Sequence, residues 1–295
     1  MVSADEAAER IRCSRALLRP CRLCPRRCEV DRPAGQTGFC GAGAEAVVAS
    51  AGPHFGEEDC LVGRGGSGTI FLAGCNLGCA FCQNSDISRS VGGDQMDAGG
   101  LARRMRLLEA RGCENINFVT PTHVAPALLA AMVEARRQGL AVPIVWNSSG
   151  YESVEMLRLL DGLVEIYMPD FKFSRSASAD RYCKAPDYPE VARASLAEMH
   201  RQVGDLVVEG GVAARGLLVR HLVMPGGAAE CREILDFLAG LSRETFVNVM
   251  GQYRPAGDVL ERRERPRYAA IARRPTAEEV AEARDYARAL GLRLG

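Results

Sequence analysis

The chain has 295 residues, of which 47% are hydrophobic and 25% are charged, and its 37 basic residues balance its 37 acidic residues. This composition is typical of a soluble globular protein, and the balanced charge argues against a nucleic-acid footprint or a polybasic membrane patch. No apolar run is long enough to span a bilayer, and the first residues are acidic where a secretory signal would be basic and then apolar. We therefore expect a cytoplasmic protein with neither a nucleic acid nor a membrane as partner.

The cysteines of the N-terminal region form a first group after a predicted helix at 4–18. Cys21, Cys24 and Cys28 come in close succession, and Cys40 follows a segment rich in proline and glycine. Twelve cysteines that cluster in this way indicate metal binding in a reducing compartment more than a disulfide scaffold. Zinc and a second 4Fe-4S cluster both accept four thiolates, so the spacing leaves the metal open. A set of reduced cysteines without metal is the alternative.

A second cysteine group follows the next predicted elements, an antiparallel ribbon at 47–65 and a buried strand at 68–74. Cys75, Cys79 and Cys82 have the spacing C-x3-C-x2-C. A 4Fe-4S cluster normally takes four cysteines, so three on one loop leave one iron open for a ligand from outside the protein. A zinc loop is the plainer reading, but zinc sites favour paired C-x2-C knuckles that supply four ligands. Three buried thiols without a metal are the second alternative to an iron-sulfur cluster.

Beyond this loop the chain alternates amphipathic helices with apolar strands. Helices are predicted at 98–110, 124–137, 153–160, 190–203 and 229–241, and strands at 115–119, 143–146, 164–168, 216–223 and 246–250. With the first strand they make six parallel units. A full eight-fold barrel needs about 250 residues, which the segment 68–252 does not reach. We therefore predict an α/β fold with a partial, open-sided six-unit (β/α) barrel, followed by a helix at 276–290 that starts in a capping box.

The second cysteine group resembles the signature of the radical S-adenosylmethionine (radical SAM) enzymes, C-x3-C-x-aromatic-C, with Phe81 as the aromatic residue. The resemblance implies a half-open barrel of six units with the cluster at its top. It also implies that the amino and carboxylate groups of SAM chelate the open iron. In that family the reduced cluster cleaves SAM to a 5'-deoxyadenosyl radical, which abstracts hydrogen. The expected domains are an N-terminal extension at 1–65, the barrel at 66–255 and a C-terminal extension at 256–295.

Polar residues at the ends of the second and sixth predicted strands depart from the family pattern. Many radical SAM enzymes have a glycine-glycine-glutamate turn after the second strand, and this chain has Thr120, Thr122 and His123 nearby. These residues are candidates for contact with SAM or substrate. His123 is also the candidate general acid or base, with capping of the next helix as the alternative. Gln252 and Tyr253 follow the sixth strand, where the radical SAM enzymes that activate glycyl radical enzymes commonly carry a histidine.

Three other strand ends match the activating enzymes of glycyl radical enzymes. Asn147 and Ser148 begin a turn similar to their threonine-asparagine-glycine turn, and Asp170 with Lys172 resembles their aspartate-x-lysine motif. Arg220 precedes apolar residues and a proline-glycine pair, as the arginine near SAM does in those enzymes. The resemblance therefore implies that these five residues bind SAM. A surface ion pair is the alternative for the aspartate and lysine.

The overall pattern is closest to the subgroup of homologues of pyruvate formate-lyase-activating enzyme. It implies an enzyme that activates a partner glycyl radical enzyme, with a reductant such as flavodoxin or ferredoxin. Radical chemistry on a small molecule or a peptide is the alternative, and a non-catalytic iron-sulfur or zinc protein is a third hypothesis.

Overall fold

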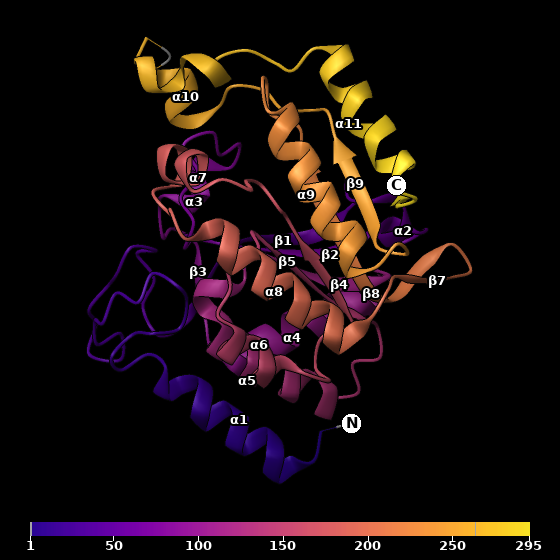
Figure 1. Cartoon of the computed structure of the whole chain (residues 1–295). Coiled ribbons are helices and arrows are strands. Elements are labelled where there is room, and N and C mark those ends of the chain that lie inside the picture. The colour runs from indigo at the N-terminus through magenta and orange to yellow at the C-terminus, as the bar shows by residue number, and fades with distance from the viewer. Residues whose placement is uncertain (1, 263) are drawn as a thin grey trace.

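The computed structural model describes residues 2–262 and 264–295. It begins with helix α1 (Ala4–Ala16), whose first turn is capped by Ser3 because the Ser3 hydroxyl accepts a hydrogen bond from the Glu6 N–H at 3.2 Å. α1 packs against α5 (Ala125–Arg137) and α6 (Val154–Leu160). Figure 1 shows α1 at the opposite end of the molecule from the C-terminal helices.

The centre of the fold is a ten-stranded sheet with the order β10-β9-β8-β6-β5-β4-β2-β1-β3, in which β7 also pairs with β8. Its six main parallel strands are β2 (Ser67–Leu72), β4 (Asn115–Val119), β5 (Ile144–Ser148), β6 (Ile166–Pro169), β8 (Val212–Leu222) and β9 (Phe246–Met250). The path starts at β10 (Arg293–Leu294) and ends at β3 (Asp94–Met96), so the sheet is open. The predicted partial barrel of six parallel units is confirmed.

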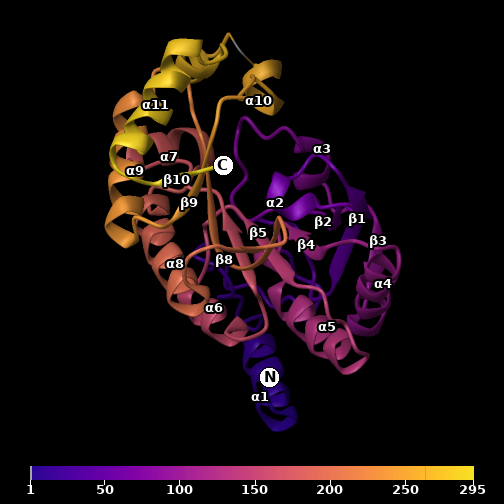
Figure 2. The ribbon, with the colours of Figure 1, turned by 90° about the vertical axis from the view of Figure 1, so that its right-hand side faces the viewer.

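The helices that connect these strands lie around the outside of the sheet, as Figure 2 shows. They are α4 (Ala98–Ala110), α5, α6, α8 (Tyr188–Val203) and α9 (Ala228–Leu241). Each presents a buried apolar face, such as Leu101, Met105 and Leu108 of α4, to the main core. The predicted helices therefore agree with the structure to within one or two residues at their ends.

The alternation of side chains along the strands separates two environments. A small apolar cluster that includes Val145, Ile166, Met168 and Leu218 is distinct from the main core between sheet and helices. Side chains two residues further along the same strands share the inner face of the barrel. Asn147 and Arg220 therefore belong to the barrel interior, and Asp170 continues the same alternation just beyond β6.

Several elements lie outside the sequence predictions. The segment expected to be a ribbon at 47–65 forms only one strand, β1 (Ala46–His54), which pairs antiparallel with β2 and β3, and then the short helix α2 (Asp59–Val62). The other elements are α3 (Ser85–Ser88), η1 (Thr122–Val124), α7 (Ser176–Cys183), β7 (Val207–Glu209), α10 (Gly257–Glu261) and η2 (Pro266–Ile271). Most are too short to produce a clear hydrophobic period. The helix predicted at 276–290 is present as α11 (Ala277–Ala289), with its Thr276–Glu279 capping box. Among the described residues, no helix combines the length and the apolar character that crossing a membrane requires.

Candidate radical cluster site

The loop that carries Cys75, Cys79 and Cys82 follows directly from the end of β2, at the carboxyl end of the parallel strands. The sulfur of Cys75 accepts a hydrogen bond from the Leu77 N–H at 3.3 Å, and the sulfur of Cys82 accepts one from the Ser88 hydroxyl at 3.4 Å. Such donors stabilise thiolate ligands of a metal or cluster.

The thiols of this loop lie in surroundings that disfavour their charged form. Burial, followed by the neighbouring Cys79, raises the pKa of Cys75 to about 11, while the N–H groups of Gly78 and Leu77 act against the increase. The Cys183 thiol, whose sulfur lies 3.5 Å from that of Cys79, and burial raise the pKa of Cys79. A bound cation would offset this cost, because thiolates are the form that ligates metal. Three thiols with aligned donors therefore fit a 4Fe-4S cluster.

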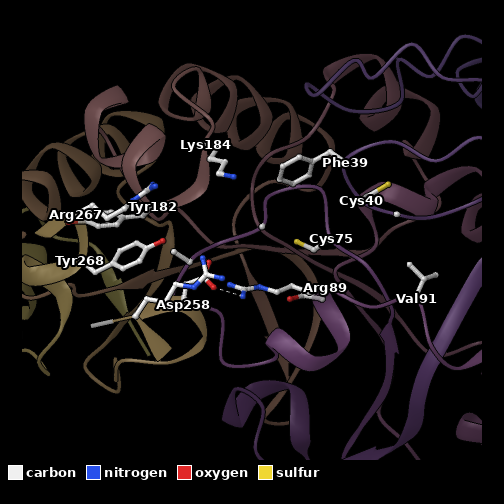
Figure 3. A pocket seen from close by; sticks show the side chains of 15 residues that line it. Phe39, Cys40, Cys75, Arg89, Val91, Tyr182, Lys184, Asp258, Arg267 and Tyr268 are labelled. Atoms are coloured by element: carbon white, nitrogen blue, oxygen red, sulfur yellow. Dashed lines mark hydrogen bonds and ion pairs between the residues drawn. The ribbon is translucent and has the colours of Figure 1, made fainter. Parts of the chain in front are cut away.

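A cavity of about 450 Å³ opens beside Cys75, and Figure 3 shows the side chains around it. Its wall comes from five parts of the chain: the N-terminal region, the cysteine loop, the end of α3 with the residues that follow it, the end of α7, and the segment around α10 and η2. The charged lining residues are Arg89, Lys184, Asp258, Arg262 and Arg267. Asp258 pairs with Arg89 at 2.8 Å, so the lining keeps an excess of positive charge. The volume is in the range of small-molecule sites.

A network of charged and amide side chains lies in the barrel interior next to this loop. Asp170 accepts hydrogen bonds from Lys172 Nζ at 2.5 Å and from Arg220 Nε at 2.9 Å. Arg220 also donates to the Asn147 side-chain oxygen at 2.6 Å and to Glu57 Oε1 at 3.2 Å. The structure therefore brings together four of the five residues predicted to bind SAM, and it adds Glu57.

The charges of this network are mutually stabilised. Burial alone would raise the pKa of Asp170, but the charges of Arg220 and Lys172 outweigh it and hold the pKa below its usual range. Burial likewise acts to lower the pKa of Lys172, and Asp170 reverses that effect and raises it. The side chains of Asp170 and Lys172 are only 17% and 14% exposed, so the alternative of a surface ion pair is wrong.

The N-terminal cysteines Cys21, Cys24, Cys28 and Cys40 line one small cavity of about 10 Å³, beside Arg26, Arg32 and His123. Cys40 is therefore a neighbour of the three earlier cysteines, although a loop separates it from Cys28 in the sequence. Within residues 2–262 and 264–295, neither this group nor the loop of Cys75, Cys79 and Cys82 has three metal-ligating side chains already spaced to bind one ion. The closed four-thiolate site and its metal stay predictions.

Comparison with known proteins identifies the family. The model of the radical SAM superfamily matches residues 69–238, which is more than half of the chain. The chain belongs to the radical SAM superfamily. Membership implies an enzyme that uses a 4Fe-4S cluster and SAM, in agreement with the cysteine loop described above.

Two further similarities were found to this radical SAM protein. An uncharacterised protein of Methanocaldococcus jannaschii is 32% identical over 298 residues, covering 97% of this chain and 79% of the relative. The structure of the cobalamin-dependent SAM radical enzyme OxsB, with aqua-cobalamin bound, has a TM-score of 0.43 and 13% identity. That similarity covers 76% of this chain, which spans 31% of the OxsB chain.

Thr122 and His123, which follow strand β4 of this radical SAM protein, both make contacts inside the fold. The Thr122 hydroxyl donates to Glu152 at 2.7 Å, and Thr120 has a φ of +60°. His123 is 1% exposed, and its Nε2 lies 2.7 Å from the Ala73 carbonyl oxygen. Burial lowers the pKa of His123 to about 4, so its imidazole is neutral at pH 7. A role for His123 in catalysis stays a prediction; its side chain makes no cap to α5.

Tyr188 of α8 connects two of the predicted SAM-binding turns and was not found from the sequence. Its hydroxyl lies 2.9 Å from the Ser149 carbonyl and 3.0 Å from the Asp170 carbonyl, and it accepts the Lys172 N–H at 2.9 Å. Ser148 accepts the N–H of Gly150 at 3.2 Å, which shapes the same turn. Tyr188, Glu57 and Cys183 lack any local motif, so only their tertiary contacts reveal them.

Gly74 is required at the start of the cysteine loop for two reasons. Its φ is +86°, and a Cβ atom there would lie 2.6 Å from the Cys40 carbonyl oxygen. The left-handed conformation costs an L-residue about 1 to 2 kcal/mol, and the backbone contact adds to that cost.

We therefore expect Gly74→Ala to lower the free energy of unfolding by at least about 1 to 2 kcal/mol and to reduce bound iron. Urea titration and iron analysis measure the two effects. Gly240→Ala in α9, where a Cβ would meet nothing within 4 Å, is the matched control and should not destabilise the protein. Equal unfolding midpoints for Gly74→Ala and wild type would contradict the expectation.

Proposed function

We propose that this radical SAM protein binds its 4Fe-4S cluster through Cys75, Cys79 and Cys82 and abstracts hydrogen from a glycine of a partner glycyl radical enzyme. The bound, reduced cluster supplies the chemistry that cleaves SAM to a 5'-deoxyadenosyl radical. The observation that carries the proposal is the contact between Asp170 and Arg220, which follows the pattern of the activating enzymes. The charges of Asp170 and Lys172 also lie close enough to influence the Cys79 thiol. The one-electron reductant would be a flavodoxin or a ferredoxin.

The polar network supports the binding of SAM, whose methionine part carries both an ammonium and a carboxylate. Asp170 can accept from the ammonium, and Lys172 can donate to the carboxylate. These two side chains pair with each other at 2.5 Å, which keeps both charges satisfied inside the barrel. Asn147 and Ser148, which are 5% and 3% exposed, would contact SAM from the neighbouring turn.

A small-molecule substrate is the second candidate. The cavity beside Cys75 supports it, because about 450 Å³ suits a metabolite and its wall includes residues of both the N-terminal and C-terminal regions. Its excess of arginine and lysine would favour an anionic compound.

A hydrogen-transfer experiment distinguishes the two candidates. Host cells are grown on deuterated glycine, and their extract is separated into a protein fraction and a small-molecule fraction. The reconstituted protein is then incubated without oxygen with SAM, a reductant and one of the two fractions. We expect deuterium from the protein fraction in 5'-deoxyadenosine, because the abstracted atom leaves with this product. Stimulation by the small-molecule fraction, without label transfer from protein, would favour the second candidate. No SAM cleavage with either fraction, even with a strong chemical reductant, would contradict both.

A further inference from the structure

Arg26 belongs to the N-terminal cysteine group, between Cys24 and Cys28, but its guanidinium binds the radical cluster loop. Its Nε donates to the Asn76 carbonyl oxygen at 2.9 Å, and one terminal nitrogen donates to the Leu77 carbonyl oxygen at 2.9 Å. One side chain therefore holds two consecutive carbonyls between Cys75 and Cys79.

The same guanidinium also binds the end of α7. It donates to the Cys183 carbonyl at 2.8 Å and to the Lys184 carbonyl, and its carbon lies 3.9 Å from the centre of the Phe39 ring. A planar fork with five N–H donors can serve several carbonyls at once and stack on an aromatic ring, which the single ammonium of lysine cannot do. The cluster loop is thus joined by Arg26 to both the N-terminal region and α7.

The two carbonyls held by Arg26 belong to the peptide groups that donate to Cys75. The Asn76 carbonyl shares a planar peptide with the Leu77 N–H, which lies 3.3 Å from the Cys75 sulfur. The Leu77 carbonyl shares the next peptide with the Gly78 N–H, which together with the Leu77 N–H acts to lower the pKa of Cys75. Because each peptide is rigid, fixing its carbonyl fixes its N–H, and a cation at the carbonyl polarises the group further.

We propose that Arg26 is a positioning residue for the radical cluster, which orients the Leu77 and Gly78 N–H groups toward the Cys75 sulfur and so raises the reduction potential of the cluster. The inference rests on the proposed cluster site. Hydrogen bonds to ligand sulfurs are among the features that set iron-sulfur potentials, because they withdraw charge from the sulfur and favour the reduced state. The N-terminal cysteine region thereby becomes part of the radical site.

The test compares wild type, Arg26→Ala, Arg26→Lys and the control Arg22→Ala in the full chain reconstituted with iron and sulfide. Arg22 is exposed and lies in the same cysteine group. Arg22→Ala therefore removes one positive charge from this group, as Arg26→Ala does. The midpoint potential is measured by redox titration followed by electron paramagnetic resonance. We expect a shift to more negative potential in Arg26→Ala, a smaller one in Arg26→Lys, which keeps the charge, and none in Arg22→Ala.

A purely structural role would reduce the iron bound per chain but leave the potential of the remaining clusters unchanged, and that result would overturn the proposal. If an Arg26 variant binds no iron, hydrogen exchange of the individual N–H groups in the cluster-free proteins decides. Faster exchange confined to the Leu77 and Gly78 N–H groups supports the proposal. Equal exchange at these two groups, or faster exchange spread over the whole fold, overturns it. Failure of wild type itself to bind a cluster would instead overturn the proposed function.

The link to the N-terminal cysteines is tested by Cys24→Ser, alone and combined with Arg26→Ala. If Arg26 couples the N-terminal cysteine group to the radical cluster, Cys24→Ser alone shifts the reduction potential of that cluster. The same substitution then has a smaller effect on this potential in the Arg26→Ala variant. Additive shifts in the double variant would overturn the conclusion that the N-terminal cysteine region is part of the radical site.

Discussion

Replacing Cys75, Cys79 and Cys82 together by alanine is expected to abolish SAM cleavage and to remove the iron-sulfur signal that responds to SAM. The three thiols lie on one loop, and in the variant the Leu77 N–H and the Ser88 hydroxyl lose their sulfur acceptors. The measurements are anaerobic iron and sulfide analysis, electron paramagnetic resonance with and without SAM, and detection of 5'-deoxyadenosine. A SAM-sensitive signal that survives in the triple variant would refute the cluster assignment.

The control for this experiment replaces Cys13 and Cys113 by alanine, since both lie outside the two cysteine groups and should leave the cluster intact.

The triple variant also tests the N-terminal group. It is expected to retain zinc or a SAM-insensitive iron-sulfur cluster at Cys21, Cys24, Cys28 and Cys40. Neither metal above background in that variant would mean that the four-thiolate site does not form.

Asp170→Asn and Lys172→Ala are expected to weaken SAM binding by about a hundredfold to several thousandfold. Removing one partner of a buried charged pair costs about 3 to 5 kcal/mol, and about 1.4 kcal/mol corresponds to a factor of ten in affinity. Both side chains are largely buried, and Asp170 also holds Arg220 at 2.9 Å. Titration of SAM into the reconstituted variants measures the effect.

Arg175→Ala is the matched control for these variants. Arg175 is 51% exposed and pairs with Glu233, which is 42% exposed, so its loss should cost under about 1 kcal/mol. Unchanged SAM affinity in both Asp170→Asn and Lys172→Ala would show that the pair does not contact SAM. A comparable loss in Arg175→Ala would show instead that the assay reports general destabilisation.

Glu57 shows why part of the polar network could not be predicted. Asp170 and Lys172 form a short motif after a clear strand, so their neighbourhood follows from the local sequence and from the rule that parallel strands end at one edge. Glu57 is 163 positions away from Arg220 and lies in a segment that was predicted to be a ribbon. The contact between Glu57 and Arg220 depends on how the turn after β1 folds back against the barrel. The spacing of hydrophobic residues in this segment does not predict that turn.

The sequence by itself determined the local features of this protein: the spacing of the two cysteine groups, the six parallel units and the order of polar residues at the strand ends. Each depends on a short motif or on the periodic burial of one face, so neighbouring residues suffice to specify it. The tertiary structure alone decided that Arg26 reaches the carbonyls of Asn76 and Leu77, and that Cys183 lies beside Cys79. These pairs are 50 to 104 residues apart in the chain, and only the packing of the completed sheet brings them into contact.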